Sequence, residues 1–406
     1  MRYLTPELSR LWAKENKMAF IAGPRQVGKT TLAKHMLSAA GAGEFYFNCD
    51  IESHRKAILK NPETFWQMRG ISGKNDRQRI VLDEIHKYPR WKRFLKGLYD
   101  SFGKDLEIIV TGSGRLDVYQ RGGDSLLGRY NLYHLHPFTV GEVVRSDRNT
   151  ACSPDEFWGN IADSHTPNGA KDALQAIETF TGFPEPLFAA STARFNRWRN
   201  SHRNLVIRED LRDLTRIREI GLIESLIMLL PEKIGSPLSI NSLREDLGVN
   251  FATVLNWLES IERLYYLFKI RPFAGRMVRT LRREEKLYLY DFSVIEDDGP
   301  RFENLVALHL RKLCDLWTDF GFGEFSLHYV RDREKREVDF LITQANRPYA
   351  LIETKLTSDD ISPSLRYFGQ HLKPRYTVQV VRHLSKSMTV SAGITTIAAE
   401  RFLAFI

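Results

Sequence analysis

Eight consecutive residues near the start of the chain constrain its fold more than any other feature. They run from Gly23 to Thr30 as Gly-Pro-Arg-Gln-Val-Gly-Lys-Thr, which fits the pattern of a glycine, four residues of any type and Gly-Lys-Ser/Thr. An apolar stretch precedes them at 18–22, and a helical stretch follows at 31–38. A loop between a strand and a helix surrounds an anion with backbone amides and a helix N-terminus. We therefore expect a phosphate-binding loop in a parallel α/β sheet.

The residue types of this loop predict how it would bind ATP with Mg²⁺. Lys29 would reach the β- and γ-phosphates, and the hydroxyl of Thr30 would ligate Mg²⁺. A chance glycine-rich turn is the alternative, which the flanking strand and helix disfavour. The expected nucleotide-binding residues are Gly23, Pro24, Arg25, Gln26, Val27, Gly28, Lys29, Thr30 and Thr31.

Two carboxylates follow a second apolar stretch. The sequence Arg-Ile-Val-Leu at 79–82 ends in Asp83 and Glu84. Asp83 is placed to hold Mg²⁺ through water, and Glu84 to polarise the attacking water, which is what separates hydrolysis from binding. Solvated residues at a strand end are the alternative interpretation. With the phosphate loop upstream, the pair predicts an ATPase.

Further polar residues are candidates for completing the site. Thr111 and Ser113 lie at the tip of the next expected strand, where one of them would contact the γ-phosphate or be an ordinary turn residue. Arg129 would neutralise transition-state charge in a neighbouring subunit, which implies a homo-oligomer. Its alternative is an arginine in a salt bridge of its own chain. Arg115 is a weaker rival for the same role.

Apolar and helical stretches alternate over residues 1–145, which predicts a parallel sheet wrapped by helices. Residues 146–235 are expected to form a mostly helical lid and linker. The expected strands of the first region are 18–22, 45–48, 79–82, 106–111 and 131–136.

Residues 236–292 have the pattern of a winged helix. A short helix is expected at 240–248, and Asn250 would cap a longer helix whose exposed face carries Thr253 and Asn256. That helix could enter a DNA major groove while a basic wing follows phosphates. Packing or protein recognition is the alternative use of such a domain. The wing residues are Arg271, Phe273, Arg276, Arg279, Arg282, Arg283, Lys286 and Tyr288.

Residues 293–406 are expected to be mixed α/β and carry a second chemical pattern. Asp339 lies in one expected strand and Glu353 closes the next, with Lys355 on the same face because side chains alternate along a strand. Glu303 lies on the preceding helix. Two carboxylates and a lysine can hold one or two divalent ions, Mg²⁺ or Mn²⁺, and activate water for phosphodiester hydrolysis. A binding platform without cleavage activity is the alternative.

Motifs along nearly the whole chain resemble one prokaryotic group. They include Leu-Asp-Glu-Ile-His-Lys-Tyr-Pro after the phosphate loop, His-Pro-Phe-Thr-Val-Gly-Glu, Gly-Phe-Pro-Glu-Pro, Phe-Glu-Asn and Ile-Glu-Thr-Lys. The chain resembles predicted AAA+ superfamily ATPases that carry a C-terminal domain of unknown function. The resemblance implies a P-loop AAA+ core, a winged helix and a PD-(D/E)XK, restriction-endonuclease-like end domain. Thr181 stands where the group more often has glycine, and Thr354 where an apolar residue is usual.

Composition narrows the choice of partner and compartment. The formal net charge of +9 favours a polyanion such as DNA, and three cysteines without CxxC spacing favour a reducing compartment. We find no signal peptide in residues 1–17 and no apolar stretch long enough to span a membrane, so we expect a cytoplasmic protein. Our first hypothesis is an ATP-driven machine acting on DNA. The alternatives are a nucleotide-gated switch for a protein partner and a transcription regulator.

Overall fold

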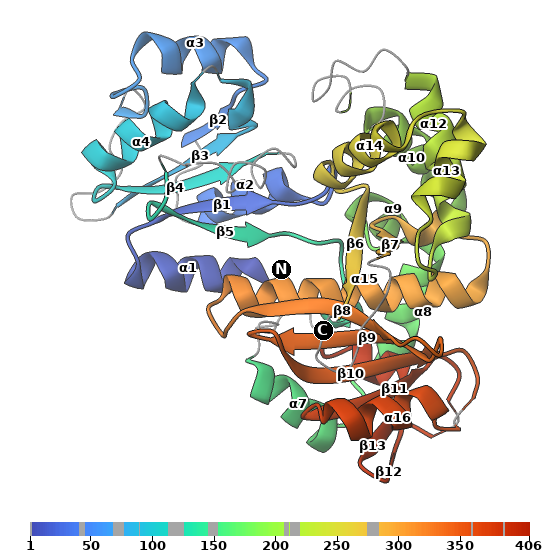
Figure 1. Ribbon diagram of the computed structural model, residues 1–406. Helices are drawn as coiled ribbons and strands as arrows, with labels where there is room; N and C mark the ends of the chain where they lie inside the picture. Colours follow the sequence, from blue (N-terminus) through green and yellow to red (C-terminus); the bar gives the residue numbers. More distant parts are fainter. Residues whose placement is uncertain are drawn as a thin grey trace. The chain divides into compact units, whose positions relative to one another are not determined.

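The computed structural model describes residues 2–39, 45–67, 77–88, 90–112, 126–144, 153–206, 211, 220–273, 284–358, 360–384 and 386–406 (Figure 1). The chain forms two compact units, Met1–His136 and Pro137–Ile406. None of the described helices combines the length and the apolar character that crossing a bilayer requires.

The first unit is a five-stranded parallel sheet with helices between its strands. Its strand order is β2-β3-β4-β1-β5, with β1 paired to β4 on one side and to β5 on the other. The elements are α1 (Leu4–Lys14), β1 (Met18–Ala22), α2 (Lys29–Ala39), β2 (Tyr46–Asn48), α3 (Glu52–Lys60), β3 (Gln78–Asp83), η3 (Ile85–Lys87), α4 (Trp91–Phe102), β4 (Leu106–Thr111) and β5 (Tyr130–His134). The predicted α/β class is confirmed.

The sheet is parallel because its central strands are apolar enough to be buried on both faces. All five residues of β1 are buried, as are five of the six in β4. In a parallel sheet the carboxyl ends of neighbouring strands meet at one edge. The ends of β1, β3 and β4 therefore bring the phosphate loop, Asp83 and Thr111 to the same edge.

The second unit begins with helices and continues into a mixed sheet covered by helices. Asn250 caps α14 as expected, since its Oδ1 accepts from the amide of Thr253 at 2.8 Å. Gly248 ends α13 in the left-handed conformation, also as expected. The helices are α6 (Val140–Val144), α7 (Pro154–Asp163), α8 (Ala170–Phe180), α9 (Pro184–Ala189), α10 (Thr192–Asn204), α12 (Ile220–Leu229), η6 (Leu230–Lys233), α13 (Ile240–Leu247), α14 (Phe251–Arg263), η7 (Phe292–Val294), α15 (Asp298–Asp319), α16 (Pro363–Leu372) and α17 (Ala399–Leu403).

One eight-stranded sheet runs through the second unit in the order β12-β13-β11-β10-β9-β8-β6-β7. The hairpin of the winged-helix region, β6 and β7, joins this sheet because β6 pairs in parallel with β8. In Figure 1 the long helix α15 lies alongside β8. The strands are β6 (Leu267–Pro272), β7 (Lys286–Leu289), β8 (Phe325–Arg331), β9 (Glu337–Gln344), β10 (Arg347–Lys355), β11 (Tyr376–Val381), β12 (Met388–Ser391) and β13 (Ile394–Ala398).

Two residues expected on the basic wing lie elsewhere. Lys286 and Tyr288 are fully buried side chains of β7, so their prediction as exposed wing residues is wrong. They alternate with Leu287 and Leu289, and the face that they share is covered by α15. Arg271 is exposed and pairs with Glu285. Arg276, Arg279, Arg282 and Arg283 lie outside the described residues, whereas Phe273 is half-buried and packs near His328.

The motif at Thr181 and Gly182 has a local physical reason. Thr181 follows α8 with φ of 62°, a conformation that favours glycine, so the threonine here holds a strained backbone. A Cβ on Gly182 would collide with the carbonyl of Phe138, whose amide donates to Gly182 O at 2.7 Å. Two motifs distant in the sequence therefore meet through their backbones.

Candidate functional site

The phosphate loop connects β1 to α2 and depends on backbone conformations that few residues adopt. φ is 149° at Gly23, 61° at Gln26 and 100° at Gly28. A Cβ on Gly23 would lie well under 3.0 Å from the carbonyl oxygen of Leu135. The amino group of Lys29 donates to the carbonyls of Gly23 at 2.9 Å and Pro24 at 2.7 Å. Lys29 therefore lies within the curve of the loop, where phosphate oxygens would replace those carbonyls.

The carboxylate of Asp83 is the meeting point of three hydroxyl groups. Thr30 donates to Oδ2 at 2.8 Å, Tyr46 donates to Oδ2 at 2.5 Å, and Thr111 donates to Oδ1. These donors come from α2, β2 and β4, the elements around the end of β3. Hydroxyl and carboxylate oxygens are the ligands that Mg²⁺ prefers, so Thr30 and Asp83 fit the predicted metal.

Tyr46 is the member of this group that the sequence did not predict. It begins β2, and the parallel pairing of β2 with β3 places it beside the strand that ends in Asp83. No sequence motif connects a tyrosine at position 46 with the carboxylate of Asp83. The available signal was its position in an apolar strand next to Phe47, which alone does not identify a site residue.

Glu84 directly follows β3 in the left-handed conformation, with φ of 51° and ψ of 39°. Such backbone strain in a residue other than glycine concentrates at functional sites. Burial raises the pKa of Glu84, Lys29 lowers it and the charge of Asp83 raises it. His86 Nδ1 lies 3.4 Å from Glu84 Oε2. A carboxylate whose pKa is raised towards neutrality is a better proton acceptor for water, as the predicted role requires.

The remaining candidate residues of the first unit differ in what they contact. Thr111 is fully buried and contacts Asp83, so it belongs to the site, whereas its contact with a γ-phosphate stays a prediction. Arg129 pairs with Asp100 at 2.6 Å and 3.1 Å, the salt bridge that the sequence left open as its alternative. Its action on a neighbouring subunit stays a prediction. Ser113 and Arg115 lie outside the described residues.

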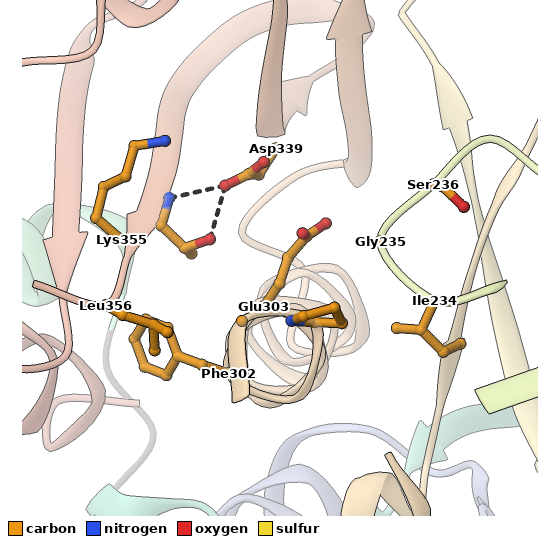
Figure 2. A pocket seen from close by; sticks show the side chains of 11 residues that line it. Ile234, Gly235, Ser236, Phe302, Glu303, Asp339, Lys355 and Leu356 are labelled. Carbon is orange, nitrogen blue, oxygen red and sulfur yellow. Dashed lines mark hydrogen bonds between the residues drawn. The ribbon is translucent and has the colours of Figure 1, made fainter. Parts of the chain in front are cut away.

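The four residues of the predicted C-terminal site converge from α15, β9 and β10. Figure 2 shows the carboxylates of Glu303 and Asp339 pointing into one space, with Lys355 beside them. That space is a cavity of about 370 Å³, also lined by Gly235 and Ser236. Its remaining lining residues are Ile234, Gly299, Pro300, Phe302, Thr354 and Leu356.

The contacts of β10 confirm that Glu353 and Lys355 share a face. Lys355 Nζ donates to Glu353 Oε1 at 2.7 Å. Thr354, where the resembling group usually has an apolar residue, donates its amide at 2.8 Å and its hydroxyl at 2.7 Å to Asp339 Oδ2. The threonine thus fixes the carboxylate of Asp339.

Lys286 and Tyr288 of β7 complete this site, although the sequence placed them on a wing. Lys286 Nζ lies 3.1 Å from Glu303 Oε1 and 2.7 Å from Glu337 Oε1. The hydroxyl of Tyr288 donates to Glu303 Oε1 at 2.6 Å. The signal available in the sequence was a lysine and a tyrosine two residues apart in an apolar strand, which predicts a shared face but not what covers it.

The C-terminal geometry does not support the predicted second metal. Among the described residues, no three His, Cys, Asp or Glu side chains form a group that could hold a metal ion. Burial and the charge of Asp339 together raise the pKa of Glu303 and of Glu353 to about 7. Lysines and hydroxyls hold the carboxylates instead, so we derive no metal-dependent step here.

A parallel sheet with a phosphate loop after its central strand and a carboxylate at the end of a neighbouring strand defines a P-loop nucleotide-binding unit. Residues 15–144 match the family model of an AAA domain, and this part of the chain belongs to that family. Residues 173–296 and 298–398 match two domains of unknown function, DUF8612 and DUF4143. The chain therefore contains a P-loop AAA domain followed by domains of unknown function, in agreement with the resemblance found in the sequence.

Relatives of the chain occur in a bacterium and in an archaeon. The chain is 22% identical over 358 residues to an uncharacterized protein of Mycobacterium tuberculosis, covering 86% of this chain and 73% of the relative. It is 23% identical over 372 residues to an uncharacterized protein of Methanocaldococcus jannaschii, with coverage of 84% and 76%.

Solved structures give only a distant likeness. RuvB of Thermotoga maritima matches with 16% identity and a TM-score of 0.30, covering 70% of this chain and 90% of RuvB. DnaA of Aquifex aeolicus bound to AMPPCP matches with 13% identity and a TM-score of 0.32, covering 63% and 86%. Likeness at these TM-scores indicates neither shared activity nor shared partners.

Proposed function

We propose that the chain binds ATP with Mg²⁺ at the phosphate loop, hydrolyses it and uses the cycle to act on DNA. The observation that carries the ATPase proposal is the group at the end of β3, where Asp83 accepts from Thr30 and Glu84 follows in a strained conformation. Bound Mg²⁺ supplies charge neutralisation at the phosphates.

The residues of the loop have separate tasks in this proposal. Lys29 would hold phosphate oxygens in place of its two loop carbonyls, and Thr30 with Asp83 would hold Mg²⁺. Asp83 keeps its position because Tyr46 and Thr111 still donate to it. Glu84 accepts a proton from the attacking water, and its raised pKa favours that transfer.

Action on DNA is supported by the second unit and by the net charge. Helices α13 and α14 precede the hairpin β6–β7 in the order expected of a winged helix, and Asn256 is exposed on α14, which supports this proposal. The formal net charge of +9 would attract a polyanion. Asn250 is exposed, but its side chain caps its own helix. Arg129 would act in a homo-oligomer if it exchanged Asp100 for the nucleotide of a neighbouring subunit.

The deciding experiment compares phosphate release by the wild type and by Glu84→Gln, with and without single- and double-stranded DNA. We expect the variant to lose at least about 100-fold in turnover while it still binds ATP, since only proton transfer is removed. Glu63→Gln, at an exposed glutamate of the same unit, is the matched control. Wild-type turnover no faster than that of Glu84→Gln would refute the ATPase; turnover indifferent to every nucleic acid would refute the DNA partner.

The lysine-held carboxylates of the C-terminal site favour a second candidate function. In it the ATP and ADP states change affinity for a protein partner, and the nuclease-like end domain is a binding platform. This candidate predicts slow or stoichiometric hydrolysis and complexes that depend on the bound nucleotide. A fast steady-state rate would count against it.

A further inference from the structure

Lys286 is the most deeply buried cation of the C-terminal site. Its side chain is 1% exposed, and its Nζ contacts one oxygen of Glu303 and one of Glu337. The ring of Tyr329 lies 5.5 Å from the same nitrogen. A buried ammonium group persists only when it is paired, and two carboxylates from α15 and β9 pair this one.

Three of the carboxylates in and near the cavity, Glu303, Glu337 and Glu353, form ion pairs within the second unit. Glu337 also binds Arg331 at 2.8 Å, and Glu353 binds Lys355. The oxygen Oε2 of Glu353 is buried without a hydrogen-bond partner among the described residues. A divalent ion takes six or more oxygens from protein and water, and within the part of the chain that the structure describes no three His, Cys, Asp or Glu side chains are grouped so that they could hold one. The ammonium group of Lys286 lies between Glu303 and Glu337 and pairs with both, so these two carboxylates are not available as metal ligands.

We propose that Lys286 is the resident cation of the C-terminal carboxylates and holds Glu303 and Glu337 in place of a divalent metal. The site is metal-free in the folded chain, and the ion pairs of Lys286 connect β7 to Glu303 of α15 and to Glu337 of β9. Burial alone would lower the pKa of Lys286, but the charges of Glu303, Asp339 and Glu337 raise it above its ordinary value, so the group stays charged at neutral pH. The proposal is independent of ATP hydrolysis.

Binding of Mn²⁺ tests the proposal directly. The full-length chain carries Thr30→Ala, which removes the metal ligand of the phosphate loop, and is titrated without nucleotide. We expect no Mn²⁺ site tighter than about 1 mM while Lys286 is present. Lys286→Met should gain one site on the order of 100-fold tighter, because removing a unit charge a few ångströms from two carboxylates leaves them to attract another cation. Adding Glu337→Gln should abolish the gain.

Lys269→Met is the matched control. Lys269 lies on the neighbouring strand β6 and also has two carboxylate partners, Glu262 at 3.0 Å and Glu285 at 3.8 Å, but it does not line the cavity. This variant should gain no Mn²⁺ site. A folded Lys286→Met chain that gains none, or a chain with Lys286 that binds Mn²⁺ in the micromolar range, would overturn the proposal.

Thermal unfolding of the Thr30→Ala chain gives a readout that needs no variant at Lys286. We expect equal midpoints in EDTA and in millimolar Mn²⁺, because the resident ammonium leaves no place for the metal in the C-terminal site. A midpoint raised by several degrees in Mn²⁺ would overturn the proposal. If Lys286→Met folds only with Mn²⁺, that rescue counts as the expected gain; if it does not fold at all, Lys286→Gln is titrated in its place under the same criteria.

Discussion

Replacing Gly23 by alanine tests how the phosphate loop is built. Gly23 has φ of 149°, a region that only glycine occupies readily, and a Cβ there would meet the carbonyl oxygen of Leu135 well under 3.0 Å. The obstructing atom is backbone, and the amide of Leu135 donates to Ala22 O at 2.8 Å, so neither strand end can yield freely. Backbone strain and the overlap of the new Cβ with the carbonyl oxygen of Leu135 each cost about 1 to 2 kcal/mol. Together they should lower the stability of the loop by about 3 kcal/mol.

Native-state hydrogen exchange of the β1 and α2 amides measures this loss in opening free energy, and a fluorescent ATP analogue measures affinity. We expect binding to weaken by about 100-fold, since the strained loop must open before it can bind phosphates. Gly128→Ala is the matched control: φ there is 82°, but a Cβ would have nothing within 4 Å. Gly128→Ala should lower the free energy of unfolding by about 1 kcal/mol. Equal losses in the two variants would refute the steric argument, and unchanged ATP affinity in Gly23→Ala would refute the assignment of the loop.

Three further predictions follow from buried polar contacts. Tyr46→Phe removes a hydrogen bond to charged Asp83, about 2 kcal/mol, and should raise the Mg²⁺ concentration for half-maximal turnover; an unchanged Mg²⁺ titration would contradict it. Asn304→Leu removes the side-chain partner of both the amide and the carbonyl of Leu289. It should lower the free energy of unfolding of the second unit by about 3 kcal/mol, measured by urea unfolding, and a loss below about 1 kcal/mol would contradict this prediction. Because the pKa of Glu353 is raised from 4.5 to about 7, the native state holds more protons than the unfolded state between these values. Its contribution to stability therefore falls as the pH rises through 7, and Glu353→Gln should flatten the slope of stability between pH 5 and 8.

The geometry of the candidate nucleotide site could be predicted largely from sequence because the residues that form its loop are local. The segment from Gly23 to Thr30 forms its loop from its own glycines and the helix that follows, and Asp83 is identified by the apolar strand that it ends. Tyr46 could not be identified in this way. Its contact with Asp83 exists because β2 pairs with β3, and strand order is a property of the whole sheet. Likewise, the ion pair of Arg129 depends on a carboxylate in a distant helix.

Lys286 shows why charge along a sequence misplaces a residue. It follows four arginines in the sequence between β6 and β7, a pattern that predicts an exposed wing, whereas its side chain in β7 contacts Glu303 of α15. Alternation alone predicted that it shares a face with Tyr288, but the parallel pairing of β6 with β8 decides that this face meets Glu303. The C-terminal site is therefore built from both sides of residue 293, where the sequence suggested a domain boundary. A fragment of 293–406 would lose Lys286 and leave Glu303 without its cation, so metal binding by that fragment would not report on the intact chain.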